Sequence, residues 1–246
     1  AKTVGEFDRS GGKRWGTRKG GSQARLLDNG NFLIANSGGC DEVNAGGAVV
    51  WSYKPLLFGR LGDPQGAFRA KSGMTWIADT ENNRIVSVSA SNQLQKKVPH
   101  DFNRPNSVER VEERKSILVA DTGNNRVIEV DDNGRVLWGF GSGNPEDLNK
   151  PTSATRLPNG NTLIADTGNS RVLEITIDHR MAFMYGGDGK RETCFLPNSA
   201  TRTPNGNILI ADTGNHRVIE VKPSGVDTSD LVWTLPIETP LFAERL

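Results

Sequence analysis

The chain has 246 residues, with 30 Lys and Arg against 29 Asp and Glu, so its formal net charge is only +1 at pH 7. This balance excludes a broad basic field for nucleic acid or for an acidic membrane surface. Two cysteines are too few for a disulfide framework or a cysteine metal cluster, and no apolar run is long enough for a membrane-spanning helix. We therefore expect no nucleic-acid partner, no membrane span, no metal and no cofactor.

The N-terminal residues continue a repeat rather than forming a domain of their own. Residues 3–8 align with the strand expected at residues 171–176, and residues 11–15 align with an outer strand. Ala1 is compatible with an end left by signal-peptidase cleavage, which leaves small residues, and equally with an end of another origin. We favour an exported protein, secreted or periplasmic.

One motif recurs along the chain and sets its period. The sequence Asp-Thr-Gly-Asn-x-Arg, or a close variant, stands at residues 79–84, 121–126, 166–171 and 212–217, with a decayed copy at residues 36–38. Successive copies lie between 42 and 46 residues apart. A period of about 40 to 50 residues with strand-like content is typical of a β-propeller, in which each repeat forms one blade.

The fourth full repeat shows the expected strands most clearly. Residues 151–157 alternate small and larger side chains, as an inner strand does, and residues 162–166 are continuously apolar, as a strand buried on both faces is. Residues 171–176 alternate again, and residues 181–185 form the outer strand. The Asn-Gly pair between the first two strands predicts a tight hairpin with positive φ at both residues. In other repeats the outer strand carries a tryptophan, which we expect to fill the gap between blades.

We interpret the acidic and basic residues of the motif as structural. The Asp can accept bonds from backbone N–H groups two residues on, the Gly can take φ > 0, and the Arg can return across the turn to pair with a carboxylate. The alternative is a ring of Asp and Arg that lines a ligand site. We favour the structural role because four blades repeat the motif almost unchanged, whereas a binding site normally needs different residues from different blades. The residues are Asp79, Arg84, Asp121, Arg126, Asp166, Arg171, Asp212 and Arg217.

Five full repeats and two partial ones predict the architecture. The five blades are expected at residues 21–60, 61–102, 103–147, 148–194 and 195–238. Residues 239–246 repeat the Pro, Ala, Arg and Leu of the inner strand at residues 151–157. We predict one all-β domain over residues 1–246, a six-bladed β-propeller whose last blade combines residues 1–20 with residues 239–246. That blade lacks a second strand, so it has three strands or the natural chain is longer; the alternative is a five-bladed propeller.

The first repeat departs from the others. Two residues are missing from the turn after Asn36, the motif Arg is lost, and Cys40 stands near its place. An apolar connection that looks exposed follows at Leu56, Leu57 and Phe58. Because local rules break most often at functional sites, we expect these residues to form an atypical surface. Drift of a repeat is the alternative explanation. Cys40 and Cys194 are predicted to be free thiols, since they fall in separate repeats.

The repeats resemble two known families. Asp-Phe-Asn-Arg-Pro at residues 101–105, followed by residues 119–127, is similar to the NHL repeat, and residues 157–166 with a later tryptophan are similar to repeats of arylsulfotransferase-like propellers. Both resemblances imply a β-propeller. These families include binding scaffolds and also enzymes, whose chemistry depends on histidines gathered at the propeller axis. His100, His179 and His216 lie in three different kinds of connection and are not expected to converge, so we carry over no catalytic residue.

The function expected from these observations is binding without catalysis. A propeller presents broad faces rich in loops, so we expect a protein partner, either for an interaction module or for a subunit of a larger extracytoplasmic assembly. The alternative is an enzyme or small-ligand binder that uses the axial pocket, related to NHL-type lyases or to arylsulfotransferases.

Overall fold

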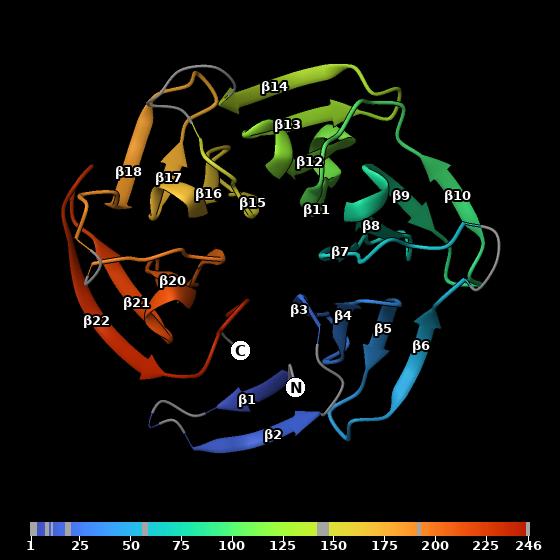
Figure 1. The fold of residues 1–246 in the computed structure, drawn as a ribbon, viewed down its shortest axis with the longest axis horizontal. Helices are drawn as coiled ribbons and strands as arrows, with labels where there is room; N and C mark the ends of the chain where they lie inside the picture. Colours follow the sequence, from blue (N-terminus) through green and yellow to red (C-terminus); the bar gives the residue numbers. More distant parts are fainter. Residues whose placement is uncertain are drawn as a thin grey trace. The chain divides into compact units, whose positions relative to one another are not determined.

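The computed structural model describes residues 4–7, 10, 12–17, 21–55, 59–141, 148–190 and 193–244. The regular elements of these residues are β-strands and short 3-10 turns (Figure 1). By packing, the chain divides into two compact units, Ala1–Val119 with Glu129–Leu137 and Ala120–Ile128 with Trp138–Leu246. None of the helices among the described residues is long and apolar enough to cross a bilayer.

Twenty strands form five four-stranded sheets, in each of which hydrogen-bonded neighbours follow one another along the chain. The first two sheets consist of β3 (Gln23–Leu26), β4 (Phe32–Asn36), β5 (Gly39–Val43) and β6 (Val49–Tyr53), and of β7 (Gly66–Arg69), β8 (Thr75–Asp79), β9 (Arg84–Val88) and β10 (Leu94–Lys97). The third consists of β11 (Pro105–Val111), β12 (Ser116–Asp121), β13 (Arg126–Asp131) and β14 (Val136–Gly141). The last two consist of β15 (Ser153–Arg156), β16 (Thr162–Asp166), β17 (Arg171–Ile175) and β18 (Met181–Gly186), and of β19 (Ser199–Arg202), β20 (Ile208–Asp212), β21 (Arg217–Pro223) and β22 (Ser229–Pro236).

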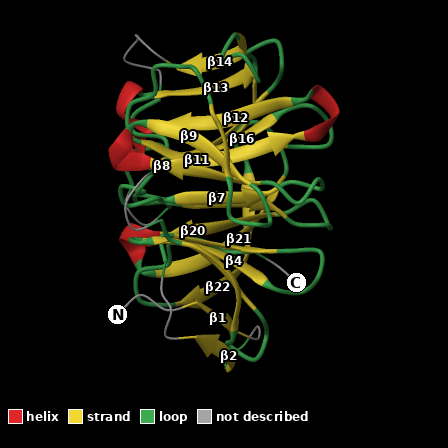
Figure 2. Ribbon diagram, turned by 90° about the vertical axis from the view of Figure 1, so that its right-hand side faces the viewer, coloured by secondary structure: helices red, strands yellow, loops and turns green. Residues whose placement is uncertain are grey.

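Five 3-10 turns connect strands of these sheets, and Figure 2 shows them in red at strand ends. Four follow the second strand of a sheet: η1 (Thr80–Asn82), η3 (Thr122–Asn124), η4 (Thr167–Asn169) and η5 (Thr213–Asn215). The fifth, η2 (Glu112–Arg114), replaces the Asn-Gly hairpin before β12. The repeated motif therefore forms the turn between the second and third strands.

The apolar pattern of the second strands has the expected consequence. Every residue of β16 is buried, and β16 pairs in antiparallel register with β15 and with β17. The hairpin before β16 differs from the prediction, because only Gly160 has positive φ, at 85°, and Asn159 does not. Gly160 N donates to Leu157 O, and Leu157 N donates to Asn161 O. The loop is therefore a turn with one left-handed residue rather than the mirror-image turn with two.

The six-bladed architecture is not supported, and the structure matches the five-bladed alternative. β1 (Val4–Phe7) and β2 (Lys13–Thr17) form a two-stranded sheet of their own. Residues 237–244, which belong to the described part of the chain, contain no strand and pair with neither. The physical reason is that the first strand of each four-stranded sheet bonds only to the second strand, and the terminal repeat has no second-strand sequence.

Adjacent sheets pack through apolar side chains. One cluster joins the first two sheets and contains Leu33, Ala35, Cys40, Tyr53, Leu61, Ala67, Ile77, Val86 and Val88. The predicted outer-strand aromatics also reach a neighbouring sheet. Trp51 Nε1 donates to Ala90 O, and Trp138 Nε1 donates to Ile177 O, each at 3.0 Å. In both cases the acceptor lies 39 residues further along the chain, in the last hairpin of the next sheet.

Candidate functional site

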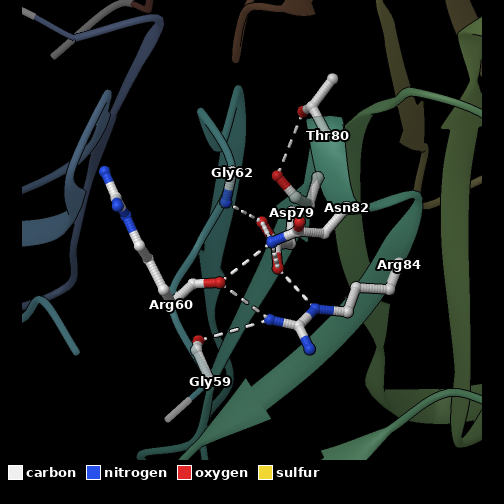
Figure 3. A network of polar contacts seen from close by, with 8 residues as sticks. Gly59, Arg60, Gly62, Asp79, Thr80, Asn82 and Arg84 are labelled. Atoms are coloured by element: carbon white, nitrogen blue, oxygen red, sulfur yellow. Dashed lines mark hydrogen bonds and ion pairs between the residues drawn. The ribbon is translucent and has the colours of Figure 1, made fainter. Parts of the chain in front are cut away.

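The motif of the second sheet forms a closed polar network (Figure 3). Asp79 ends β8 and is fully buried. Its Oδ2 accepts from Arg84 Nε at 2.5 Å and from Asn82 Nδ2 at 3.0 Å, while its Oδ1 accepts from Gly62 N at 2.6 Å. Arg84 Nη2 also donates to the carbonyl oxygens of Gly59 and Arg60. The network therefore ties the motif turn to the chain that enters the same sheet.

The same pair recurs in three more sheets. The Nε–Oδ2 distance is 2.7 Å for Arg126 with Asp121, for Arg171 with Asp166 and for Arg217 with Asp212. In all four sheets the carboxylate side chain is 0% exposed, and the Arg side chains are between 15% and 24% exposed. A ligand outside the fold cannot touch these carboxylates, so their geometry supports the structural interpretation.

Two details of the predicted turn are wrong. The Asp side chain caps no N–H of its own 3-10 turn; Asp166 Oδ1 instead accepts from Asn149 N, 17 residues earlier. The left-handed residue is not the motif Gly but the residue before the Arg: Asn83, Asn125, Ser170 and His216, with φ between 51° and 53°. Gly168 is required for space, because a Cβ there would lie 2.6 Å from Asn149 O.

In the second sheet the glycine lies on the other side of this close contact, outside the motif turn. Its turn carries Glu81 where other turns carry Gly, and the facing residue is Gly62, whose added Cβ would lie 3.0 Å from Glu81 Cβ. The backbone bond is kept, since Glu81 N donates to Gly62 O at 2.8 Å as Gly168 N does to Asn149 O. One of the two facing residues therefore has to be a glycine.

Burial and hydrogen bonding shift the pKa of Asp166, the motif Asp of the fourth sheet, in opposite directions. Burial raises the pKa of Asp166, and the bonds from Asn149, Arg171 and Asn169 lower it without cancelling the rise. A carboxylate in this position depends on its donors to stay ionised. Removal of the Arg alone would therefore leave an uncompensated buried charge.

The first sheet lacks this network. Gly39 lies opposite Asn36 in the register, where Arg84 lies opposite Asp79, so Gly39 and not Cys40 occupies the place of the Arg. Cys40 is fully buried in the core between the first two sheets, and this burial raises the pKa of its thiol. Cys40 is therefore not part of a surface. Leu56, Leu57 and Phe58 lie outside the described residues.

A buried acid takes the place of an apolar residue in the same sheet. Asp41 is 1% exposed and occupies the register position of Val86 in the second sheet. Its carboxylate accepts from Ser52 Oγ at 2.7 Å, from Asn36 Nδ2 at 3.1 Å and from Lys54 Nζ at 2.6 Å. The lost Asp–Arg pair is thus replaced by a different ion pair, one strand position away from Cys40.

The shortened turn of the first sheet opens a pocket of about 470 Å³ beside the turn of the second sheet. Ser37, Arg60, Leu61, Gly62, Asp63, Glu81 and Asn82 line it. Ser37, Arg60 and Glu81 are exposed, and their side chains bond to no other described residue. In Figure 3 the Arg60 side chain points away from the Asp79 network, to which Arg60 contributes only its carbonyl oxygen. The pocket combines a hydroxyl, a guanidinium and carboxylates, and is the candidate site.

Comparisons with known proteins agree with this arrangement of sheets and turns. Residues 196–219, which span β19, β20 and the motif turn of the fifth sheet, match the NHL repeat family. A crystal structure of a protein of unknown function from Bacteroides caccae superposes with a TM-score of 0.74 at 17% identity, covering 96% of this chain and 90% of that one. The chain is a β-propeller that carries an NHL repeat. The expected all-β propeller fold and the NHL resemblance are thereby confirmed, with the five blades of the alternative rather than six.

Two enzymes share the propeller fold. A streptogramin B lyase structure has a TM-score of 0.69 at 15% identity, covering 97% of this chain and 78% of that one. A virginiamycin B lyase from Staphylococcus aureus has a TM-score of 0.64 at 14% identity, covering 89% and 70%. At these identities the likeness extends to the fold alone. No curated protein matches the chain in sequence.

The three histidines lie at separate turns. His100 Nδ1 lies 3.1 Å from Gly134 O. His179 Nε2 lies 2.9 Å from Gly139 O, and its ring stacks on Trp138. His216 is the left-handed residue of the fifth motif turn. Within the described residues no group of three or more His, Cys, Asp or Glu side chains is placed to hold a metal ion.

Sequence reasoning missed a second network that joins neighbouring blades. Glu42 in β5 accepts from Asn29 and Asn31 and forms an ion pair with Arg69 of the next blade at 3.2 Å. Glu174 repeats this arrangement with Asn159, Asn161 and Arg202. The available signal was an Arg at the last position of three first strands: Arg69, Arg156 and Arg202.

Proposed function

We propose that this propeller is a non-enzymatic binding module that recognises a protein partner at the pocket beside the first blade. The observation that carries the proposal is the loss, in this blade alone, of the turn network that the other four blades share. The loss coincides with a pocket of about 470 Å³, within the range of roughly 300–1,000 Å³ typical of binding pockets. The module acts alone or as a subunit of a larger assembly.

The chemistry of the lining favours binding over catalysis. Ser37 has no adjacent base among the pocket residues, so its hydroxyl is not activated as a nucleophile. Two carboxylates line the pocket, and that of Asp63 is engaged, since its Oδ2 accepts from Gln65 Nε2 at 2.9 Å. Hydrogen-bond donors and acceptors side by side are instead what a polypeptide surface requires.

The test is a capture experiment with matched variants. Immobilised wild-type protein, the Ser37→Trp variant and the Ser91→Trp variant are each exposed to an extract of the native source, and bound proteins are quantified by mass spectrometry. Ser37 lines the pocket, while Ser91 is an exposed serine in the hairpin at the other end of the second blade. We expect a partner that wild type and Ser91→Trp retain and that Ser37→Trp loses.

Two results would overturn the proposal. One is a set of captured proteins that is the same for all three baits. The other is turnover of a streptogramin B by the purified protein, which would favour the alternative of a lyase related to the structural neighbours. Thermal melts of both variants serve as the control for folding.

A further inference from the structure

Three motif turns, those of the second, third and fourth blades, each make two bonds to the following blade. The first joins the side chain of the left-handed turn residue to the N–H of the residue before the next blade's proline: Arg104 N donates to Asn83 Oδ1 at 2.7 Å, and Lys150 N donates to Asn125 Oδ1 at 2.9 Å. Leu196 N donates to Ser170 Oγ at 3.3 Å in the same way. An oxygen on a short side chain is thus the group that this N–H binds.

The second bond joins the motif Thr to the proline itself. Thr80 Oγ1 donates to Pro105 O at 2.7 Å, Thr122 Oγ1 to Pro151 O at 2.6 Å, and Thr167 Oγ1 to Pro197 O at 2.7 Å. Thr213 donates to Pro240 O in the fifth blade. At three junctions the two bonds together satisfy the N–H of the residue before the proline and the C=O of the proline.

The junction between the first two blades has the residue pair that precedes the inner strand, but the motif turn that should bond to this pair is missing. Asp63 precedes Pro64 and has φ of 45°, close to the 48° of Arg104 and the 50° of Lys150. Among the described residues nothing accepts from Asp63 N or donates to Pro64 O. The turn at residues 36–39 is two residues shorter than the other motif turns, and its one residue of positive φ, Gly39, has no side chain that could accept from Asp63 N.

We propose that the pocket accepts a turn of a partner polypeptide that carries an asparagine followed by a basic residue. The asparagine Oδ1 accepts from Asp63 N, and a hydroxyl or amide of the same turn donates to Pro64 O, as the chain's own motif does at its other junctions. The inference rests on the proposed function, of which it specifies the partner's chemistry.

The charges around the pocket account for the basic residue. The carboxylates of Asp63 and Glu81 face one guanidinium, that of Arg60, so the local charge is negative. Glu81 is peculiar to this turn, since glycine occupies its place at residues 123, 168 and 214. An anionic ligand is disfavoured by these carboxylates, whereas a cationic side chain beside the asparagine is attracted.

The probe is a cyclised peptide with the sequence of residues 121–127, labelled and followed by fluorescence anisotropy against the full-length protein. We expect saturable binding to wild type and to Ser91→Trp. A peptide with Ala at the position of Asn125 should bind about tenfold more weakly, as expected for one lost hydrogen bond. Equal binding of both peptides would overturn the inference.

A second variant restores the missing turn within the protein. Replacing residues 36–39 by the sequence of residues 121–126 adds two residues and supplies the Thr and the Asn that the other turns have. This variant should melt no lower than wild type and should lose the peptide, because its own turn fills the pocket. If it does not fold, Ser37→Trp gives the same readout; peptide binding that either variant retains in folded form contradicts the inference.

The outcomes separate the inference from the proposed function. In one outcome the peptide does not bind up to millimolar concentration, but wild type and Ser91→Trp capture a partner that Ser37→Trp does not. This outcome would overturn the inference about the asparagine-bearing turn and would leave the proposed binding function intact. If the peptide does not bind and the Ser37→Trp variant captures the same proteins as wild type, both the inference and the proposed function are overturned.

Discussion

Replacing Arg171 by Ala tests the role of the motif pairs directly. The substitution removes a donor 2.7 Å from Asp166 Oδ2 and leaves the carboxylate buried, with Asn149 N at 2.7 Å and Asn169 Nδ2 at 2.8 Å as remaining donors. One charge-assisted hydrogen bond contributes roughly 1.5–3 kcal/mol, and a buried charge left without its partner raises the cost further. We expect a loss of about 2–4 kcal/mol in the free energy of unfolding at pH 7.

The loss should depend on pH in a definite direction. Burial raises the pKa of Asp166, and removal of the arginine leaves less to oppose that rise. A carboxyl group whose folded-state pKa lies above its unfolded value of about 3.9 destabilises the fold above the folded-state pKa and ceases to do so as pH falls through it. The difference between variant and wild type should therefore shrink in acid.

The sequence of the first blade suggests a matched control for Arg171→Ala. It carries Asn36 and Gly39 where the fourth blade carries Asp166 and Arg171, so it lacks both charges together. The Asp166→Asn, Arg171→Gly double variant should lose less stability than the sum of the two single variants, since no buried charge is left alone.

The assay is equilibrium unfolding in urea with a parallel thermal melt. For a chain of this length, 2–4 kcal/mol corresponds to a fall in Tm of ~4–16 °C. An Arg171→Ala variant that melts with wild type, or a double variant whose cost equals the sum of the singles, would refute the reasoning and reopen the ligand-ring interpretation.

Three further predictions concern packing, acid stability and thiol chemistry. Gly168→Ala should cost about 2 kcal/mol, because its Cβ would meet a backbone oxygen at 2.6 Å; urea unfolding within about 0.5 kcal/mol of wild type would contradict this. Burial raises the pKa of Glu42, but hydrogen bonds from two asparagines and the charge of an arginine outweigh it and lower the pKa. Glu42 thus stabilises the fold above its unfolded pKa of about 4.3, and this contribution is lost as pH falls through the lower folded-state value. The Asn31→Ala variant should therefore lose less stability than wild type between pH 7 and pH 3. A stability–pH profile identical to that of wild type would contradict this prediction. Cys40 and Cys194 are buried and free, so maleimide should label neither in the native protein and both after denaturation; native labelling would show that the core opens.

The strands were predictable because their signal is local. The second strand of the fourth repeat was expected at residues 162–166 and is found there, since a continuous apolar run between two turns leaves few alternatives. The prediction of a sixth blade was wrong because it relied on the same local signal. Residues 240–244 resemble a first strand and begin as one, with Pro240 O accepting from Thr213, but resemblance does not supply the second strand that a first strand must pair with.

The turns and the site depended on contacts that a linear motif does not reveal. The motif predicts a left-handed conformation for its Gly, whereas Gly168 is needed because an added Cβ would lie 2.6 Å from the carbonyl oxygen of Asn149, 19 positions earlier. The two residues missing after Asn36 are a local signal, and they marked the first blade as the atypical one. The N–H of Asp63, unbonded within the described residues, has no signal in the linear motif, because its counterparts at Arg104 and Lys150 are bonded by residues of the preceding blade.

The bonds between each motif turn and the next proline also bear on how repeats of this kind can be spliced. Thr167 lies in the motif turn of the fourth sheet, and its hydroxyl donates to Pro197 O at the entry to the fifth sheet. A cassette cut between sheets would separate donor from acceptor at both seams, whereas one cut inside the hairpin at Asn159 would carry the whole joint with it. Exchange of modules between such chains, by recombination or in the laboratory, should therefore succeed with breakpoints in that hairpin rather than at the apparent boundaries.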